Sequence, residues 1–317
     1  VRVGKFHKLD QVVELAQHRN LHLLLTFNDY HSPDLATVAQ LDAQIAAHLA
    51  DEPTIMGYDL ENEPGFYAIM SAQYPPEYQP LAHTTALIDH YGERMSQAEV
   101  DAWRQTAAGR RVVPQHLSSW LGYLYANAYF LYLDFLRAAS DWVQRNGGTS
   151  LHYLDSPEAD VWRPFLHVLD DTVRAWIRSQ MDLIRAADPC HLITVGYNNY
   201  IFAGLPGNSL LDFQSYHRYT SAGYGGLRGT FNIADKLAQT LPTTPLTLGE
   251  FGYSNASGST PDSSQPIDPG LTAIHEAAVY LYLRNQGYGG GFKWMLNNVW
   301  GGSNPYEANF GVFAADD

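Results

Sequence analysis

Two glutamates stand where apolar segments of the chain end, and their side chains could act on a substrate together. Glu63 follows an apolar run at residues 55–60, and Glu250 follows another at 246–248. One carboxylate can attack the anomeric carbon of a sugar while a protonated carboxyl group supplies a proton to the departing oxygen. Cleavage of a glycosidic bond with retained configuration needs two such groups about 5–5.5 Å apart.

An acidic pair alone is weak support, because the chain holds 33 Asp and Glu residues. A glutamate at the end of a strand can also be a structural ion-pair partner. Glu61 is a rival for the role of Glu63, because it lies two residues earlier and on the same side of a regular strand. The Asn-Glu-Pro sequence at 62–64 favours Glu63.

The elements that must position these residues follow an alternating pattern. Apolar residues at helical spacing alternate with short buried-strand runs, which is typical of a parallel α/β sheet. The glycine-rich stretch 222–229 is predicted to be a loop. Predicted helices cover 9–20, 35–49, 164–187, 233–240 and 270–285, and predicted strands cover 21–27, 55–60, 192–197, 211–216, 246–248 and 291–295.

Each of the six strands ends in polar or aromatic residues. A doubly wound sheet can hold six strands, whereas a (β/α)8 TIM barrel needs eight and carries its active site at the carboxyl ends of its strands. We expect one α/β catalytic domain over residues 1–317, a TIM barrel without its first two strands and last helix. A further polypeptide segment would then complete the barrel. Residues 65–160 are predicted to be a mainly helical insertion after strand 4, with a long helix at 115–144.

Composition excludes several classes of function. The net charge is −14 and no basic cluster stands out, so we expect no nucleic-acid partner. No apolar run is long enough to cross a bilayer, and we expect no membrane partner. The single cysteine, Cys190, excludes a disulfide within the chain and a cysteine-rich zinc site. The histidines show no metal-binding spacing, and no phosphate loop is present, so neither metal nor cofactor is expected.

Two segments resemble a known group of enzymes. Gly-Tyr-Asp-Leu-Glu-Asn-Glu-Pro at 57–64 and Thr-Leu-Gly-Glu-Phe-Gly at 247–252 are similar to the strand-4 and strand-7 motifs of the clan A retaining glycoside hydrolases, in particular the cellulase- and mannanase-type enzymes of family 5. The resemblance implies that Glu63 is the acid/base and Glu250 the nucleophile. It also implies that Asn62 contacts the sugar 2-hydroxyl.

Three further resemblances accompany these motifs. The Tyr-His-Arg-Tyr sequence ending at Tyr219 resembles a strand-6 element, which implies that Tyr219 hydrogen-bonds the nucleophile and that His217 supports the sugar site. Trp294 resembles the strand-8 tryptophan that forms a platform under the reactive sugar. His31 resembles a sugar-binding histidine at the end of strand 3. The family's strand-2 arginine has no counterpart here.

The sequence therefore predicts a retaining β-glycoside hydrolase that acts by double displacement on a carbohydrate substrate. A non-catalytic carbohydrate-binding barrel and a transglycosylase remain as alternatives. β-Glucan, β-mannan, β-galactoside and β-xyloside all suit these strand ends. Tyr224, Tyr253 and Trp300 are further candidates for contacts with outer sugar units.

Overall fold

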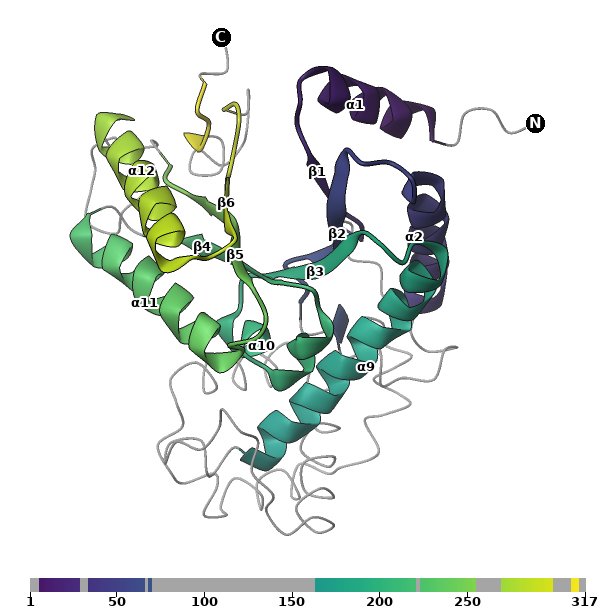
Figure 1. Ribbon diagram of the computed structural model, residues 1–317. Helices are drawn as coiled ribbons and strands as arrows, with labels where there is room; N and C mark the ends of the chain where they lie inside the picture. The colour runs from purple at the N-terminus through teal and green to yellow at the C-terminus, as the bar shows by residue number, and fades with distance from the viewer. Residues whose placement is uncertain are drawn as a thin grey trace, which may run out of the picture. The chain divides into compact units, whose positions relative to one another are not determined.

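The computed structural model describes residues 6–28, 34–65, 68–69, 163–220, 223–254, 269–298 and 309–313. The chain divides into two compact units, Val1–Leu192 with Leu205–Leu210, and Ile193–Gly204 with Leu211–Asp317. Figure 1 labels the helices and strands of both units. The insertion predicted at 65–160 lies outside the described residues apart from 65, 68 and 69, and the helix predicted at 115–144 lies wholly outside them.

The first unit has two parallel strands. In the ladder of β1 and β2, Leu24 lies opposite Gly57 and Thr26 opposite Asp59. Helices α2 and α9 lie side by side (Figure 1). The elements of this unit are α1 (His7–His18), β1 (Leu23–Thr26), α2 (Leu35–Leu49), β2 (Ile55–Asn62), α9 (Arg163–Ala187) and the 3-10 helix η4 (Pro206–Leu210).

Helix α2 begins where its sequence provides a cap. The Asp34 carboxylate accepts a hydrogen bond from the Thr37 backbone N–H at 3.2 Å, which satisfies one of the free donors of the first turn. One face of α2 then enters the core at helical spacing. Its buried residues are Leu35, Val38, Ala39, Asp42, Ala46 and Leu49.

Asp42 is the one acidic residue on this buried face. It is 2% exposed, and its Oδ2 has no hydrogen-bond partner among the described residues. Burial raises the pKa of Asp42 to about 7, and the negative charge of Glu61 adds to the rise. Because the folded pKa lies above the unfolded value, the folded state binds more protons between about pH 4 and pH 7. The free energy of unfolding should therefore fall as pH rises through this window.

We predict that Asp42→Asn removes this pH dependence. The variant should match the wild type near pH 4 and exceed its free energy of unfolding at pH 8 by up to about 4 kcal/mol, the value of a shift of roughly three units. Urea unfolding of both proteins from pH 4 to pH 8 measures the difference. Asp182→Asn, at an exposed position of α9, should follow the wild type. An Asp42→Asn curve parallel to that of the wild type would contradict the prediction.

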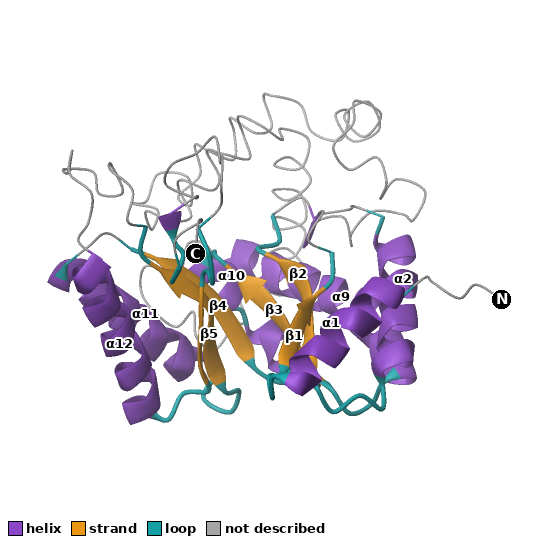
Figure 2. Ribbon diagram, turned by 90° about the horizontal axis from the view of Figure 1, so that it is seen from above, coloured by secondary structure: helices purple, strands orange, loops and turns teal. Residues whose placement is uncertain are grey.

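The second unit has four parallel strands in the order β3, β4, β5, β6. Helices α11 and α12 lie side by side on one side of this sheet, as Figures 1 and 2 both show. The elements are β3 (Leu192–Tyr197), α10 (Tyr200–Ala203), β4 (Gln214–Tyr219), α11 (Tyr224–Thr240), β5 (Leu246–Gly252), α12 (Pro269–Gln286) and β6 (Gly290–Lys293).

Aromatic and polar contacts join α11 to α12. The rings of Phe231 and Tyr282 stack with their centroids 3.8 Å apart. Asp235 accepts hydrogen bonds from the hydroxyls of Tyr282 at 2.6 Å and Tyr288 at 2.7 Å. Burial and the Asp235 carboxylate together raise the pKa of Tyr282 to about 12. These contacts fix the helix pair whose amino-terminal ends come after β4 and β5.

The prediction of a glycine-rich loop over 222–229 is wrong from Tyr224 onward, because α11 begins there. Each helical glycine costs roughly 1 kcal/mol relative to alanine. The buried face of the helix at Thr230, Ala234 and Leu237 outweighs that cost.

The bounds of β4 and β5 differ most from the predicted ones. The strand predicted at 211–216 is β4 at Gln214–Tyr219, since Leu211 and Phe213 are buried without joining the ladder. The strand predicted at 246–248 continues to Gly252, because backbone pairing with β4 extends past the last aliphatic residue. Both strands therefore carry candidate residues within the ladder itself.

Helices alternate with parallel strands along the chain, as the apolar pattern predicted. This arrangement is consistent with part of a TIM barrel. Within the part of the chain that the structure describes, no helix combines the length and apolar character needed to cross a membrane.

Candidate active site

In the second unit, β4 and β5 bring three of the predicted site residues together. The Tyr219 hydroxyl donates a hydrogen bond to Glu250 Oε2 at 2.5 Å. His217 is buried, and its Nδ1 lies 3.6 Å from the same carboxylate oxygen, beyond hydrogen-bond distance. A donor on the carboxylate stabilises the ionised form that a nucleophile needs. The side chain of Glu250 is 19% exposed, so solvent or a ligand can still reach it.

A β-bulge sets the direction of the Glu250 side chain. Tyr216 pairs with Leu248 and His217 pairs with Glu250, so Gly249 is an extra residue on β5. Side chains alternate between the two faces of a strand, and one extra residue shifts that alternation by one position. The bulge therefore places Glu250 on the face that carries His217 instead of the face that carries Leu248.

The position of Gly249 has no room for a side chain. A Cβ atom there would lie 2.0 Å from Ser215 Oγ and 2.9 Å from two atoms of the His217 ring. Ser215 and His217 are both buried, so neither can move away without disturbing its neighbours. Glycine at 249 is therefore part of what holds His217 beside Glu250.

We predict that Gly249→Ala lowers the free energy of unfolding by about 1–3 kcal/mol, the usual cost of overpacking. Urea unfolding measures this loss. Gly225→Ala is the matched control, because nothing lies within 4 Å of a Cβ at that position in α11 and alanine favours a helix. Adding Ser215→Ala to Gly249→Ala should recover part of the loss. Equal stability of the two glycine variants would refute the argument.

Trp294 follows β6 in the same unit. Its side chain is 40% exposed, and its backbone N–H donates to the Phe251 carbonyl at 2.9 Å. A Cβ at Gly252 would lie 2.5 Å from the Trp294 carbonyl oxygen, so the glycine admits this close approach. An exposed aromatic face beside the carboxyl ends of β5 and β6 can stack on a sugar ring.

Lys293 and Phe310 make contacts around Trp294 and Tyr219. Lys293 Nζ lies 3.0 Å from Glu276 Oε1 of α12, and it donates to the carbonyl oxygens of Trp294 and Phe310. Burial lowers the pKa of Lys293, and the Glu276 carboxylate opposes that effect. The Phe310 ring packs edge-on against Tyr219 with centroids 5.2 Å apart. These contacts anchor the backbone on either side of Trp294 and orient the Tyr219 ring.

In the first unit, Asn62 ends β2 and Glu63 follows it with a left-handed backbone, φ 47°. Non-glycine residues seldom adopt this conformation, and it is concentrated at functional sites. Glu61 is fully buried and accepts a hydrogen bond from the Asn28 side-chain amide at 2.7 Å. The left-handed residue ends the strand's alternation, so Glu63 need not share the environment of Glu61. The half-buried Glu63 is thus the more accessible carboxyl group.

The predicted site residues are distributed over both units. Asn62 and Glu63 belong to the first, and His217, Tyr219, Glu250 and Trp294 belong to the second. His31 and Trp300 lie outside the described residues.

Three features that support the candidate site were not predicted from the sequence. They are the bulge at Gly249, the ion pair of Lys293 with Glu276, and the packing of Phe310 on Tyr219. A glycine inside a strand pattern was a signal for the first of these. The other two carried no sequence signal.

No family model matches the chain, and no curated protein matches it. Solved structures of three β-galactosidases are similar to it. One, from the Antarctic haloarchaeon Halorubrum lacusprofundi, is 16% identical with a TM-score of 0.51 over 98% of this chain and 48% of that protein. The enzyme from Bacillus circulans sp. alkalophilus is 14% identical, with a TM-score of 0.52, and the match covers 96% of this chain and 45% of that protein.

The third is a GH42 enzyme from G. stearothermophilus that was solved as a catalytic mutant. It is 11% identical, with a TM-score of 0.54, and the match covers 98% of this chain and 46% of that protein. This chain thus spans just under half the length of each of the three proteins. At these identities the likeness shows a shared fold, and all three of these structures are β-galactosidases.

Proposed function

We propose that this chain carries the active site of a retaining β-glycoside hydrolase. Glu250 is the nucleophile and Glu63 the general acid/base. The hydrogen bond from Tyr219 to Glu250 carries the proposal, because it gives an accessible carboxylate a hydroxyl donor, as a nucleophile in this role needs. The left-handed Glu63 supports it as a second carboxyl group at a strand end. The shared fold of the β-galactosidase structures agrees with this chemistry.

The reaction proceeds in two displacements. A Glu250 carboxylate oxygen attacks the anomeric carbon as the bond to the leaving oxygen breaks, and Glu63 gives that oxygen its proton. A glycosyl ester on Glu250 and a free alcohol result. Glu63, now ionised, takes a proton from water, whose oxygen attacks the anomeric carbon and expels the Glu250 carboxylate. Two inversions restore the β configuration.

Neighbouring residues bind the sugar. The side-chain oxygen of Asn62 accepts a hydrogen bond from the sugar 2-hydroxyl, and this hydrogen bond strengthens in the transition state. Trp294 stacks on the apolar face of the reacting sugar. His217 and His31 bind further hydroxyls. The reaction as written uses neither metal nor cofactor.

We take a β-galactoside as the first substrate to test, because the three solved structures are β-galactosidases. The motif resemblance to family 5 instead favours β-glucosides or β-mannosides. We assign the choice between these sugars to the segments after β2 and β5, 65–160 and 254–269, which lie almost wholly outside the described residues.

The test is a set of 4-nitrophenyl β-glycosides (galactoside, glucoside, mannoside and xyloside), with NMR of the first sugar released. Turnover of one sugar with the β-anomer appearing first is the expected result. The α-anomer appearing first would overturn the double displacement. Transfer to added sugar in preference to water would identify a transglycosylase. Binding without turnover by folded protein would identify a carbohydrate-binding barrel.

A further inference from the structure

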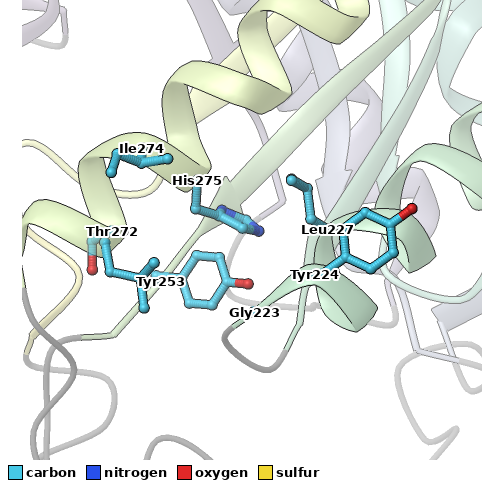
Figure 3. A pocket seen from close by; sticks show the side chains of 8 residues that line it. Gly223, Tyr224, Leu227, Tyr253, Thr272, Ile274 and His275 are labelled. Atoms are coloured by element: carbon cyan, nitrogen blue, oxygen red, sulfur yellow. The ribbon is translucent and has the colours of Figure 1, made fainter.

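A pocket of about 230 Å³ lies in the second unit, between the first turns of α11 and α12 and the end of β5. Its walls are mostly apolar. Tyr224, which is 78% exposed, stands at one side, and Ile274, which is 68% exposed, stands at another. The lining residues are Gly223, Tyr224, Leu227, Tyr253, Leu271, Thr272, Ile274 and His275 (Figure 3).

A buried histidine contributes polar atoms to this apolar pocket. His275 is 8% exposed, and neither of its ring nitrogens has a hydrogen-bond partner among the described residues. Its ring meets the Tyr253 ring edge-on, with centroids 3.5 Å apart. Figure 3 shows the imidazole ring of His275 extending from α12 toward the side chains of Tyr253 and Leu227. Buried polar groups are rarely left without a partner, so these nitrogens point to a ligand.

The protonation state of His275 defines what the ligand must offer. Burial lowers the pKa of His275 to about 4, so the imidazole is neutral at pH 7. A neutral imidazole has one nitrogen that accepts a hydrogen bond and one that donates. A ligand with a hydroxyl or N–H group can therefore satisfy the accepting nitrogen.

We propose that this pocket binds a small aromatic molecule of one or two fused rings that carries a single hydroxyl or N–H donor, directed at His275. An apolar cavity of about 150 Å³ holds a benzene molecule, so the larger volume here suits a second fused ring. The aliphatic side chains of Leu227, Leu271 and Ile274 and the Tyr253 ring supply apolar contacts to such a molecule.

A sugar fits this pocket poorly. Each sugar hydroxyl would lose its hydrogen bonds to water on entering apolar walls, and few polar atoms are available to replace them. Tyr253 and Tyr224 were candidates for contacts with outer sugar units. Tyr253 is only 3% exposed and packs on His275, so it offers no open platform for a sugar ring. The pocket therefore serves a ligand different from the proposed substrate.

Titration calorimetry of the whole chain with indole and with indene tests the proposal. The two molecules have the same shape, but indene lacks the N–H group. We expect saturable 1:1 binding of indole and about tenfold weaker binding of indene, the usual effect of one lost hydrogen bond. In His275→Phe the two affinities should become equal. Indole should also shift the ring-nitrogen NMR signals of His275.

Two further variants test the location. Leu227→Trp should fill the pocket and abolish binding of both molecules, whereas Leu281→Trp, at an exposed position of α12 outside the lining, should leave binding unchanged. Circular dichroism shows whether each variant is folded. Absence of saturable indole binding by the wild type, equal affinity for indene, or unchanged binding by Leu227→Trp would overturn the proposal.

Competition separates this site from the catalytic one. Methyl β-galactoside should not displace indole, and displacement would identify the pocket as a sugar subsite. Glu250→Ala should bind indole as the wild type does. Loss of the proposed glycosidase activity would therefore leave this result unaffected.

Discussion

Replacing Glu250 with alanine should lower kcat on the best aryl β-glycoside by about 10⁴-fold or more, because the covalent intermediate can no longer form. The loss should be similar for good and poor leaving groups, since every substrate needs the same attack. Initial rates measure the effect. A 2-fluoro glycoside, whose ester hydrolyses slowly, should add one glycosyl mass to the wild type and none to the variant.

Sodium azide separates a lost nucleophile from a misfolded protein. Azide can enter the space that the Glu250 carboxylate vacates and attack the anomeric carbon from the same side. The Glu250→Ala variant should therefore regain turnover with azide and release the α-glycosyl azide. A variant that keeps more than about a tenth of wild-type kcat would refute the assignment of Glu250 as nucleophile.

Replacing Glu63 with alanine should produce a loss that depends on the leaving group. Proton donation contributes about 10²–10⁴-fold when the departing oxygen is basic, as in a disaccharide. A 2,4-dinitrophenyl group leaves without a proton, so its release should fall far less. Rates for the two substrate types, measured on the same preparations, give the ratio. The variant should also lose the alkaline decline of the pH–rate profile.

Glu61→Gln is the control for this experiment. Glu61 is fully buried and bonded to Asn28, so its loss should lower stability without changing the ratio between leaving groups. An equal loss on both substrate types in Glu63→Ala, or a leaving-group effect confined to Glu61→Gln, would transfer the acid/base role to Glu61. Melting curves of both variants show whether stability contributes to the rates.

Regular elements were the most predictable part of this protein. Helix α2 and strand β3 were predicted with their observed bounds, because an apolar face and an apolar run each ended at clear polar residues. Prediction failed where burial and backbone pairing acted against local composition. The glycines after Gly223 form part of a helix, and β5 runs through Gly249 and Glu250 because its partner strand continues beside it.

The motif resemblance predicted one contact of the candidate site as well as its residue types. The motif resemblance named Tyr219 and Glu250 together, and the structure joins them by a hydrogen bond. The glycine inside the strand pattern signalled a bulge, but the position of the bulge depends on how β5 aligns with β4, which no pattern along the chain shows. The sequence was equally silent on the His275 ring nitrogens, which have no hydrogen-bond partner among the described residues, since a satisfied core histidine has the same sequence signature.

The left-handed backbone at Glu63 has a consequence for how this position can evolve. A left-handed backbone costs a residue with a β-carbon roughly 1 kcal/mol or more of conformational free energy, whereas glycine adopts it freely and asparagine nearly so. Selection for stability and selection for turnover therefore favour different residues at position 63. A lineage that no longer needs catalysis would drift toward glycine or asparagine here while keeping its fold. In a library randomised at this codon, the best-expressed clones should be inactive ones.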